Sequence, residues 1–345
     1  MKLSIIVICW NDLKVIGDCL QSIFEQTHLP DYEVIVSDNG SSDGSVARIQ
    51  KDFPRVKLVE NGANLGFAKG NNAGIKVAQG EYVLILNPDT IIRDRALEKL
   101  VAFAERHPEA GAFGCRVLNP DGSYQYPARP LPTVKGWLLG ALGLSWLGKI
   151  SDAFVSDRYY GWDGRTERPI GFQSGCCVLF RGDLLRRLGG FDERFFYHFE
   201  ETDLCYRVWK SGFKILFTPA AEITHLGGQS VGRFPIRFAL ETYRGGYRYF
   251  YKHYGPRGLL GVHRVYLLRL RLRRAGYGLL RLFKRSEALE NRLKLYRIAI
   301  QWHSQLNPSK FIATGEEPNV GFEPLAPAPS MTQYEAGLAA GHPPR

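Results

Sequence analysis

Three signals that would assign this chain to a common protein class are missing from its 345 residues. No apolar run reaches the 18 or more residues that a membrane-spanning helix needs. The six cysteines include no CxxC pair and no zinc-like spacing, which predicts buried, reduced thiols in a cytoplasmic compartment. The apolar run of residues 3–9 is too short for a signal peptide and is better explained as a buried first strand.

Two glycine motifs that bind phosphates are also absent. No GxGxxG sequence follows the first expected strand, which argues against a nucleotide-dependent oxidoreductase. No GK[ST] sequence occurs, so the glycine- and asparagine-rich loop 61–72 is not a Walker loop. Its composition leaves two interpretations open: a loop that presents backbone N–H groups to a polar ligand, or a plain connecting turn.

Acidic residues are scarce in one long segment. Residues 233–300 hold 17 lysines and arginines against three acids, a balance of +14, so the rest of the chain sums to about −3 of the total +11. The positive charge therefore belongs to a local surface. Its mixture of leucine and arginine favours an interfacial helix on anionic lipid over a solvated basic helix, and we expect no nucleic-acid partner.

Strand and helix patterns alternate through the first third of the chain. The expected strands cover residues 3–9, 33–37, 56–60, 82–86 and 111–118, and the expected helices cover 12–26, 43–52, 67–78 and 94–106. This order predicts an α/β fold with a Rossmann-like, mostly parallel sheet and helices on both faces. We expect residues 119–170 to form an irregular insert near the ligand edge of the sheet, and residues 235–303 to be helical.

Polar residues stand where several apolar segments end. Asp38 ends the second strand, Asn87-Pro88-Asp89 follows the strand 82–86, and His225 ends a later segment. The carboxyl ends of parallel strands form the edge where α/β sheets bind ligands. Asp38 is therefore a candidate contact for a ribose or base, and Asp89 for a divalent cation held against a phosphate. His225 is a candidate metal or phosphate contact. The plainer alternative is that these residues only end strands and cap helices.

A dense group of carboxylates follows a run of aromatic residues. Glu200, Glu201 and Asp203 lie within four positions, shortly after Asp192. Crowded carboxylates in an apolar setting acquire raised proton affinity, which suits one of them to act as a general base. On a helix, Glu200 and Asp203 would share a face and Glu201 would point elsewhere. The alternative is an acidic helix N-terminus that is favoured by the helix dipole.

Taken together and in order, these motifs resemble the inverting family 2 glycosyltransferases of GT-A fold, and most of all their bacterial rhamnosyltransferase-like branch. The resemblance covers roughly residues 3–230. The segments that carry it are SIIVICWN (4–11), VSDNGS (36–41), NLGFA (64–68), LNPDT (86–90), GFD (190–192), FEETDL (199–204) and His225.

The resemblance implies how the donor is bound. Asp38 would contact the nucleotide base, Cys9 and Asn11 would line the same pocket, and Asn64 would shape its wall.

Asn87-Pro88-Asp89 stands where the family carries its DxD motif. The resemblance implies that Asp89 binds Mg²⁺ or Mn²⁺ bridging the donor diphosphate, with Asn87 beside it. His225 resembles a histidine that helps to hold the metal or the diphosphate in some members.

The base is the main departure from the family. The branch usually shows Glu-Asp-x-Asp, in which the second residue deprotonates the acceptor hydroxyl, and here Glu201 fills that place. Its additional methylene changes the reach by about an ångström or more, which matters for rate. We predict Glu201 as the base and Glu200, Asp203 and Asp192 as supports near the acceptor. A catalytically silent sugar-nucleotide-binding module is the alternative.

We therefore expect a GT-A domain over residues 1–230, with a nucleotide-sugar-binding half (1–118) and an acceptor and catalytic half (119–230). A basic, membrane-associating helical segment (231–305) and a disordered tail (306–345) would follow. The expected reaction is the inverting, metal-dependent transfer of rhamnose from dTDP-rhamnose to a lipid-linked or polysaccharide acceptor in cell-surface glycan synthesis. A UDP- or GDP-sugar is the alternative donor. The resemblance implies a protein in the cytoplasm, peripheral on the inner face of the cell membrane.

Overall fold

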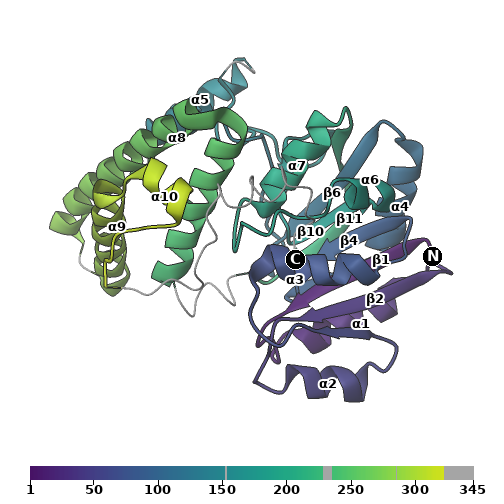
Figure 1. Ribbon diagram of the computed structural model, residues 1–345. Coiled ribbons are helices and arrows are strands. Elements are labelled where there is room, and N and C mark those ends of the chain that lie inside the picture. Colours follow the sequence, from purple (N-terminus) through teal and green to yellow (C-terminus); the bar gives the residue numbers. More distant parts are fainter. Residues whose placement is uncertain (152–153, 228–234, 285, 322–345) are drawn as a thin grey trace. The chain divides into compact units, whose positions relative to one another are not determined.

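The computed structural model describes residues 1–151, 154–227, 235–284 and 286–321, which form two compact units (Figure 1). Of the described residues, the first unit contains 1–131, 161–196 and 200–227, and the second contains 132–151, 154–160, 197–199, 235–284 and 286–321. This division differs from the expected single boundary at residue 230, because much of the insert belongs to the second unit.

A nine-stranded sheet forms the centre of the first unit, in the order β3-β2-β1-β4-β10-β6-β11-β5, with β8 also paired to β11. Its strands are β1 (Leu3–Cys9), β2 (Tyr32–Asp38), β3 (Lys57–Glu60), β4 (Tyr82–Leu86), β5 (Thr90–Ile92), β6 (Ala110–Leu118), β8 (Arg168–Pro169), β10 (Cys177–Arg181) and β11 (Lys214–His225). The longest pairs, β1 with β2 and β6 with β11, are parallel. The mostly parallel α/β sheet is thus confirmed, and β10, β5 and β8 are its antiparallel members. A separate two-stranded sheet pairs β7 (Ala128–Arg129) with β9 (Phe172–Gln173).

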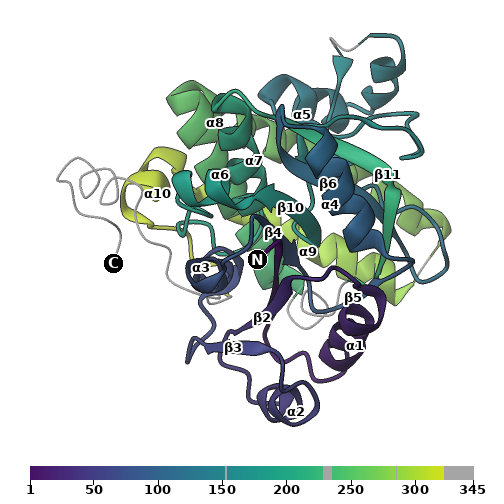
Figure 2. The ribbon, with the colours of Figure 1, turned by 90° about the vertical axis from the view of Figure 1, so that its right-hand side faces the viewer.

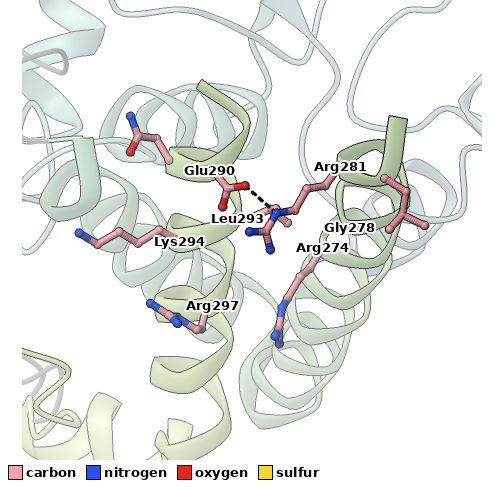
Figure 3. Close-up of a pocket in the computed structure, with 9 residues that line it drawn as sticks. Arg274, Gly278, Arg281, Glu290, Leu293, Lys294 and Arg297 are labelled. Carbon is pink, nitrogen blue, oxygen red and sulfur yellow. Dashed lines mark ion pairs between the residues drawn. The ribbon is translucent and has the colours of Figure 1, made fainter. Parts of the chain in front are cut away.

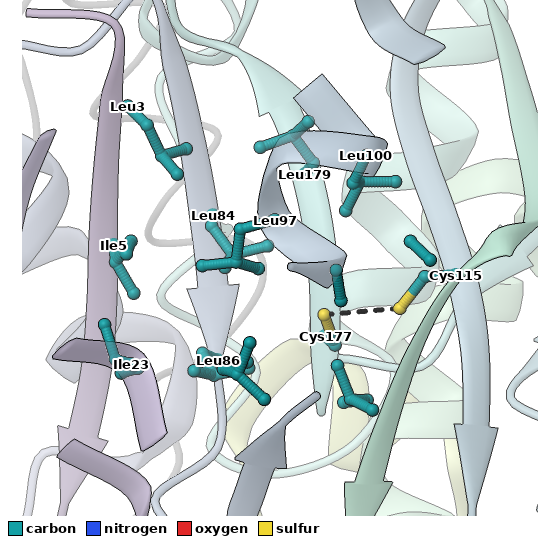
Figure 4. Close-up of a cluster of buried hydrophobic side chains, with 14 of the residues drawn as sticks. Leu3, Ile5, Ile23, Leu84, Leu86, Leu97, Leu100, Cys115, Cys177 and Leu179 are labelled. Carbon is teal, nitrogen blue, oxygen red and sulfur yellow. Dashed lines mark hydrogen bonds between the residues drawn. The ribbon is translucent and has the colours of Figure 1, made fainter. Parts of the chain in front are cut away.

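Helices cover both faces of the large sheet (Figure 2). They are α1 (Ile16–Gln26), α2 (Ser45–Asp52), α3 (Gly66–Val77), α4 (Ala96–Arg106), α6 (Gly182–Arg187) and α7 (Glu200–Lys210). On one face, Leu3 and Ile5 of β1 belong to the same buried cluster as Ile23 of α1 and Leu97 and Leu100 of α4 (Figure 4). Alternation along the strand turns Ile6 and Ile8 to the other face.

On that second face α3 approaches β1 closely. A Cβ atom at Gly74 would lie 2.7 Å from Cγ2 of Ile6, and one at Gly70 would lie 2.7 Å from Cδ1 of Ile8. These glycines, four positions apart, therefore let the helix pack directly on the strand.

All six cysteines are buried free thiols, as expected from their apolar surroundings in the sequence. Sγ of Cys115 lies 3.5 Å from Sγ of Cys177, a contact between thiols on β6 and β10 (Figure 4).

The second unit is helical, as predicted for residues 235–303. It contains α5 (Val134–Ala141), the 3₁₀ helix η1 (Ser145–Lys149), α8 (Pro235–Phe283), α9 (Glu287–Gln305) and α10 (Pro308–Thr314). Helix α8 is kinked at Gly255, which directly precedes Pro256. The φ of Gly255 is 64°, outside the helical range. No helix in the described ranges is both long and apolar enough to cross a membrane.

Two expectations about irregular segments were wrong. The insert contains helix α5, and the tail predicted to be disordered begins with helix α10. Phe311 and Ile312 of α10 are buried, and Asn307 caps its first turn by accepting a hydrogen bond from the Lys310 N–H. The prolines and glutamates of the tail obscured this short apolar segment. Residues 322–345 lie outside the described part of the chain.

Candidate active site

The sheet topology brings the predicted site residues to one edge. Cys9 pairs with Asp38 at the carboxyl ends of β1 and β2, and β4 runs parallel beside β1. Strand β6 is antiparallel to β10, which is itself antiparallel to β4, so β6 and its parallel partner β11 share the direction of β4. His225, the last residue of β11, therefore lies at the same edge.

Asp38 has one occupied and one available carboxylate oxygen. Its Oδ2 accepts hydrogen bonds from the N–H groups of Gly40 (2.9 Å) and Ser41 (3.0 Å), which fixes the turn after β2. Its Oδ1 is buried and accepts no hydrogen bond from any described residue. A buried, unsatisfied acceptor is costly, so this oxygen is suited to receive an N–H or O–H from a ligand.

Cys9 and Asn11 support this turn. The N–H of Asn11 donates to Oγ of Ser41 at 2.8 Å, and Oδ1 of Asn11 accepts from the N–H of Ser42 at 2.8 Å. Sγ of Cys9 lies 3.7 Å from Oγ of Ser41. Burial raises the pKa of Cys9 to about 12, so this residue is a neutral thiol beside the turn.

Asn64 shapes the entry into α3, where its Oδ1 accepts a hydrogen bond from the N–H of Gly66 at 3.0 Å. Two further asparagines join this loop to β2. Nδ2 of Asn39 donates to the carbonyl of Gly66, and Nδ2 of Asn61 donates to Oδ1 of Asn39, both at 3.0 Å. Sequence reasoning did not single out Asn39 or Asn61, although both stand in polar segments that it marked.

Asp89 and His225 are in direct contact. Oδ1 of Asp89 lies 3.2 Å from Nε2 of His225, and both side chains are largely buried. The backbone explains the contact, because β5 begins immediately after Asp89 and pairs Thr90 with His225. The N–H of Leu226 then donates to the Asp89 carbonyl at 2.9 Å.

Gln125, which sequence reasoning missed, fixes the orientation of His225. Its Nε2 donates to the backbone carbonyl of His225 at 2.6 Å, and its Oε1 lies 2.9 Å from Nδ1 of the same residue. An amide oxygen can only accept, so Nδ1 carries a proton. In the neutral imidazole, Nε2 then carries a lone pair beside the Asp89 carboxylate, an arrangement that a bound cation would stabilise.

These residues fit a divalent cation. Two ligands at right angles around an octahedral ion, each about 2.1 Å from it, lie about 3.0 Å apart, close to the 3.2 Å between Asp89 and His225. Oδ1 of Asn87 is buried without a hydrogen-bond partner in the described chain, and its Nδ2 lies 3.4 Å from Nε2 of His225. No group of three or more His, Cys, Asp or Glu side chains placed to bind a metal occurs among the described residues, so phosphate and water would complete the shell, as is usual for Mg²⁺.

Helix α7 begins with Glu200 and Glu201, and both are buried. Burial, followed by the charge of Glu201, raises the pKa of Glu200 well above its ordinary value. Burial raises the pKa of Cys176 to about 12, and the negative charges of Asp89 and Glu201 both add to this effect. The backbone before Cys176 adjoins Glu201, because a Cβ atom at Gly175 would lie 3.8 Å from Cβ of Glu201. The carbonyl of Cys176 in turn accepts a hydrogen bond from the N–H of Asn87 at 3.0 Å.

Asp192 and Asp203 are each held by an arginine. Asp192 and Arg194 form a buried pair in which Nε of Arg194 donates to Oδ1 at 2.8 Å. Oδ2 of Asp203 accepts from Nε of Arg207 at 2.8 Å. These pairings favour a structural role for both aspartates rather than proton transfer. Asp192 would hold the loop before α7, and Asp203 would hold α7 itself.

Comparison with known proteins agrees with the family resemblance of the sequence motifs. Residues 4–189, more than half of the chain, match the model of the family described as "Glycosyl transferase family 2". A relative from Mycobacterium tuberculosis, N-acetylglucosaminyl-diphospho-decaprenol L-rhamnosyltransferase, is 34% identical over 215 residues, which are 59% of this chain and 69% of that protein. Rhamnosyltransferase WbbL of Escherichia coli is 24% identical over 60% of this chain and 78% of its own.

A solved structure shares the fold. It is that of the mannosyltransferase PcManGT from Pyrobaculum calidifontis in complex with GDP-Man and Mn²⁺, with a TM-score of 0.52 at 18% identity. The match covers 87% of this chain and 86% of the other. The expected GT-A fold is confirmed.

Proposed function

The chain belongs to glycosyl transferase family 2 and is a glycosyltransferase, and from this premise we propose that it moves one sugar from a nucleotide sugar to an acceptor hydroxyl with inversion. The name of the mycobacterial relative supports rhamnose as the transferred sugar and a polyprenyl-diphosphate-linked glycan as the acceptor. We propose dTDP as the nucleotide that carries the rhamnose. A UDP- or GDP-sugar is the alternative donor. The reaction would serve cell-surface glycan synthesis.

The single observation that carries this proposal is the contact between Asp89 and the oriented His225, at the same sheet edge as the available Oδ1 of Asp38. Asp38 would hold the nucleotide base or ribose at one end of the donor. Asp89 and His225 would hold Mg²⁺ or Mn²⁺ at the diphosphate, with Asn87 beside them. When bound, such a cation neutralises charge on the departing nucleotide.

Glu201 is proposed as the base. As the acceptor oxygen forms its bond to the anomeric carbon, the bond from that carbon to the nucleotide diphosphate breaks, and the hydroxyl proton passes to Glu201. A single displacement from the opposite face inverts the anomeric centre. Burial favours the neutral form of Glu200, and a neutral carboxyl cannot accept the hydroxyl proton, so Glu200 is less suited to this role.

Donor binding tests the metal part of the proposal. In calorimetric titrations with dTDP-rhamnose, we expect the wild type to bind more tightly with Mn²⁺ than without it. Asp89→Ala should lose this difference, because it removes a charged ligand. Gln125→Leu should weaken Mn²⁺-dependent binding by about 10- to 100-fold, since it leaves both ligands but frees the His225 ring.

Asp183→Ala is the matched control, because this aspartate is 63% exposed and forms only a surface pair. Equal donor affinity with and without Mn²⁺ in the wild type would contradict the metal assignment. Titration with UDP- and GDP-sugars in parallel distinguishes the alternative donors.

We also propose that the protein works at the inner face of the cell membrane. The acceptor class named for the mycobacterial relative is lipid-linked, and residues 233–300 carry a net charge of +14. A basic surface of this kind is attracted to the anionic cytoplasmic leaflet.

A further inference from the structure

A basic groove lies between α8 and α9 in the second unit (Figure 3). Its volume is about 550 Å³. The side chains that define it are Arg274, Arg281 and Leu282 of α8 and Glu290, Lys294 and Arg297 of α9. Figure 3 shows the labelled arginines of α8 opposite the charged residues of α9.

Helical spacing places these residues in two facing stripes. Arg274 and Arg281 are seven positions apart on α8, with Gly278 between them on the same face. Lys294 and Arg297 are three apart on α9. Gly278 has no side chain, and nothing lies within 4 Å of where its Cβ atom would be, which leaves room between the stripes.

The positive charge of the groove is mostly uncompensated. Nε of Arg281 forms an ion pair with Glu290 at 2.6 Å. No described residue forms an ion pair with Arg274, Lys294 or Arg297. The groove thus holds four cationic side chains and one acidic side chain. The cations repel one another in this concave site, and a bound anion would relieve that repulsion.

Apolar side chains adjoin the groove at the end of α8. Leu282 lines the groove and is 76% exposed, while Phe283 and Leu279 are 83% and 61% exposed. Large apolar side chains that remain this exposed beside a basic surface match the interface between lipid headgroups and acyl chains.

We propose that this groove binds the phosphate of an anionic membrane lipid, with Leu279, Leu282 and Phe283 inserted at the acyl boundary. Arg274 and Arg297 are the principal phosphate contacts, because guanidinium groups bind phosphate oxygens in pairs. The inference deepens the proposed membrane location by assigning it to one site, and it does not depend on sugar transfer.

The test is co-sedimentation of the full chain with vesicles of 30% phosphatidylglycerol in phosphatidylcholine, at fixed ionic strength and without donor. Arg274→Gln/Arg297→Gln should reduce the partition coefficient by about 30-fold, since each charge near an anionic surface strengthens binding about fivefold. The control Arg264→Gln/Arg271→Gln removes the same charge from exposed positions of α8 outside the groove. It should lose markedly less binding, because the attraction of a charge falls off with its distance from the anionic headgroups.

The outcomes separate the site from general attraction. If both double variants lose vesicle binding equally, the groove is not the lipid site, although the proposed membrane location still holds. No binding of the wild type to the anionic vesicles would overturn both. Inorganic diphosphate should compete only weakly with vesicles, whereas full displacement at constant ionic strength would identify a soluble phosphate as the ligand instead. Stronger binding of a single-stranded RNA than of vesicles would also overturn the proposal.

Discussion

Isosteric replacement can distinguish the roles that we propose for the adjacent glutamates Glu200 and Glu201. Glu201→Gln should lower kcat by at least about 100-fold, because general bases typically contribute 10²- to 10⁴-fold, while the donor affinity stays near wild type. Glu200→Gln should retain most of the activity, since burial already favours the neutral form of Glu200. Steady-state kinetics together with donor titration measures both effects.

The pair is its own control, because each change removes one ionisable carboxyl at the start of α7. If Glu200→Gln is inactive and Glu201→Gln is active, the base is Glu200 and the assignment made here is wrong.

The raised pKa of Glu200 also predicts how stability depends on pH. The folded state binds the proton of Glu200 more tightly than the unfolded chain, whose glutamate pKa is about 4.3. This stabilisation is complete below that value and is lost as the pH rises through the raised folded pKa. Urea unfolding from pH 4 to 8 should therefore show Glu200→Gln gaining stability relative to wild type as the pH rises. A constant difference would contradict the burial effect.

The sequence predicts that Asp89 and His225 lie at the ligand edge of the sheet, but it does not predict that Gln125 orients His225. Asp89 and His225 each end an apolar run, a local pattern that the sequence displays. Gln125 stands in an aromatic-rich insert without a motif. It reaches His225 because its N–H donates at 3.0 Å to the carbonyl of Val117, near the end of β6, and β6 pairs with β11. Such long-range pairing leaves no periodic signal.

A largely buried ion pair, Arg207 with Asp203, fixes helix α7. Its contribution to stability can be compared with that of the exposed pair of Arg187 and Asp183. Arg207 binds the fully buried Asp203 and also donates to the carbonyls of Leu188 and Gly190, both at 2.7 Å. Arg207→Ala should lower the free energy of unfolding by about 3 kcal/mol, because it removes the cation that faces a buried carboxylate. Denaturant unfolding measures this change.

Arg187→Ala is the matched control. Arg187 and Asp183 have the same i,i+4 spacing, but both side chains are at least 60% exposed, so solvent screens their attraction and little change is expected. Asp203→Asn/Arg207→Met should recover part of the loss by removing both charges. A similar small loss in the 187 and 207 variants would show that the buried pair is not needed.

The elements of the parallel core were predicted better than those outside it. Buried parallel strands are continuous apolar runs, so β1, β2 and β4 are visible in the sequence. Strand β10 is equally apolar, but its antiparallel insertion between β4 and β6 depends on pairing with distant strands. The two-residue strands β7, β8 and β9 are too short to carry a periodic pattern.

The chain forms two compact units, so we expect two thermal unfolding transitions in calorimetry. Donor and Mn²⁺ should raise the midpoint of the transition of the first unit only, because a ligand stabilises the unit that binds it, by about 2.7 kcal/mol at 100 times Kd. Asp89→Ala should remove the shift. A single transition that shifts as a whole would show that the units unfold as one.

The six buried thiols have a practical consequence for chemical labelling. Thiol reagents react with the thiolate, and burial raises the pKa of Cys9, Cys19, Cys176 and Cys205 to about 12. Almost none of these groups is ionised at neutral pH. A cysteine introduced at an exposed position such as Leu282 would therefore react with a maleimide dye far ahead of the native ones. Fluorescent reporters can be attached to the end of α8 without first replacing any natural cysteine.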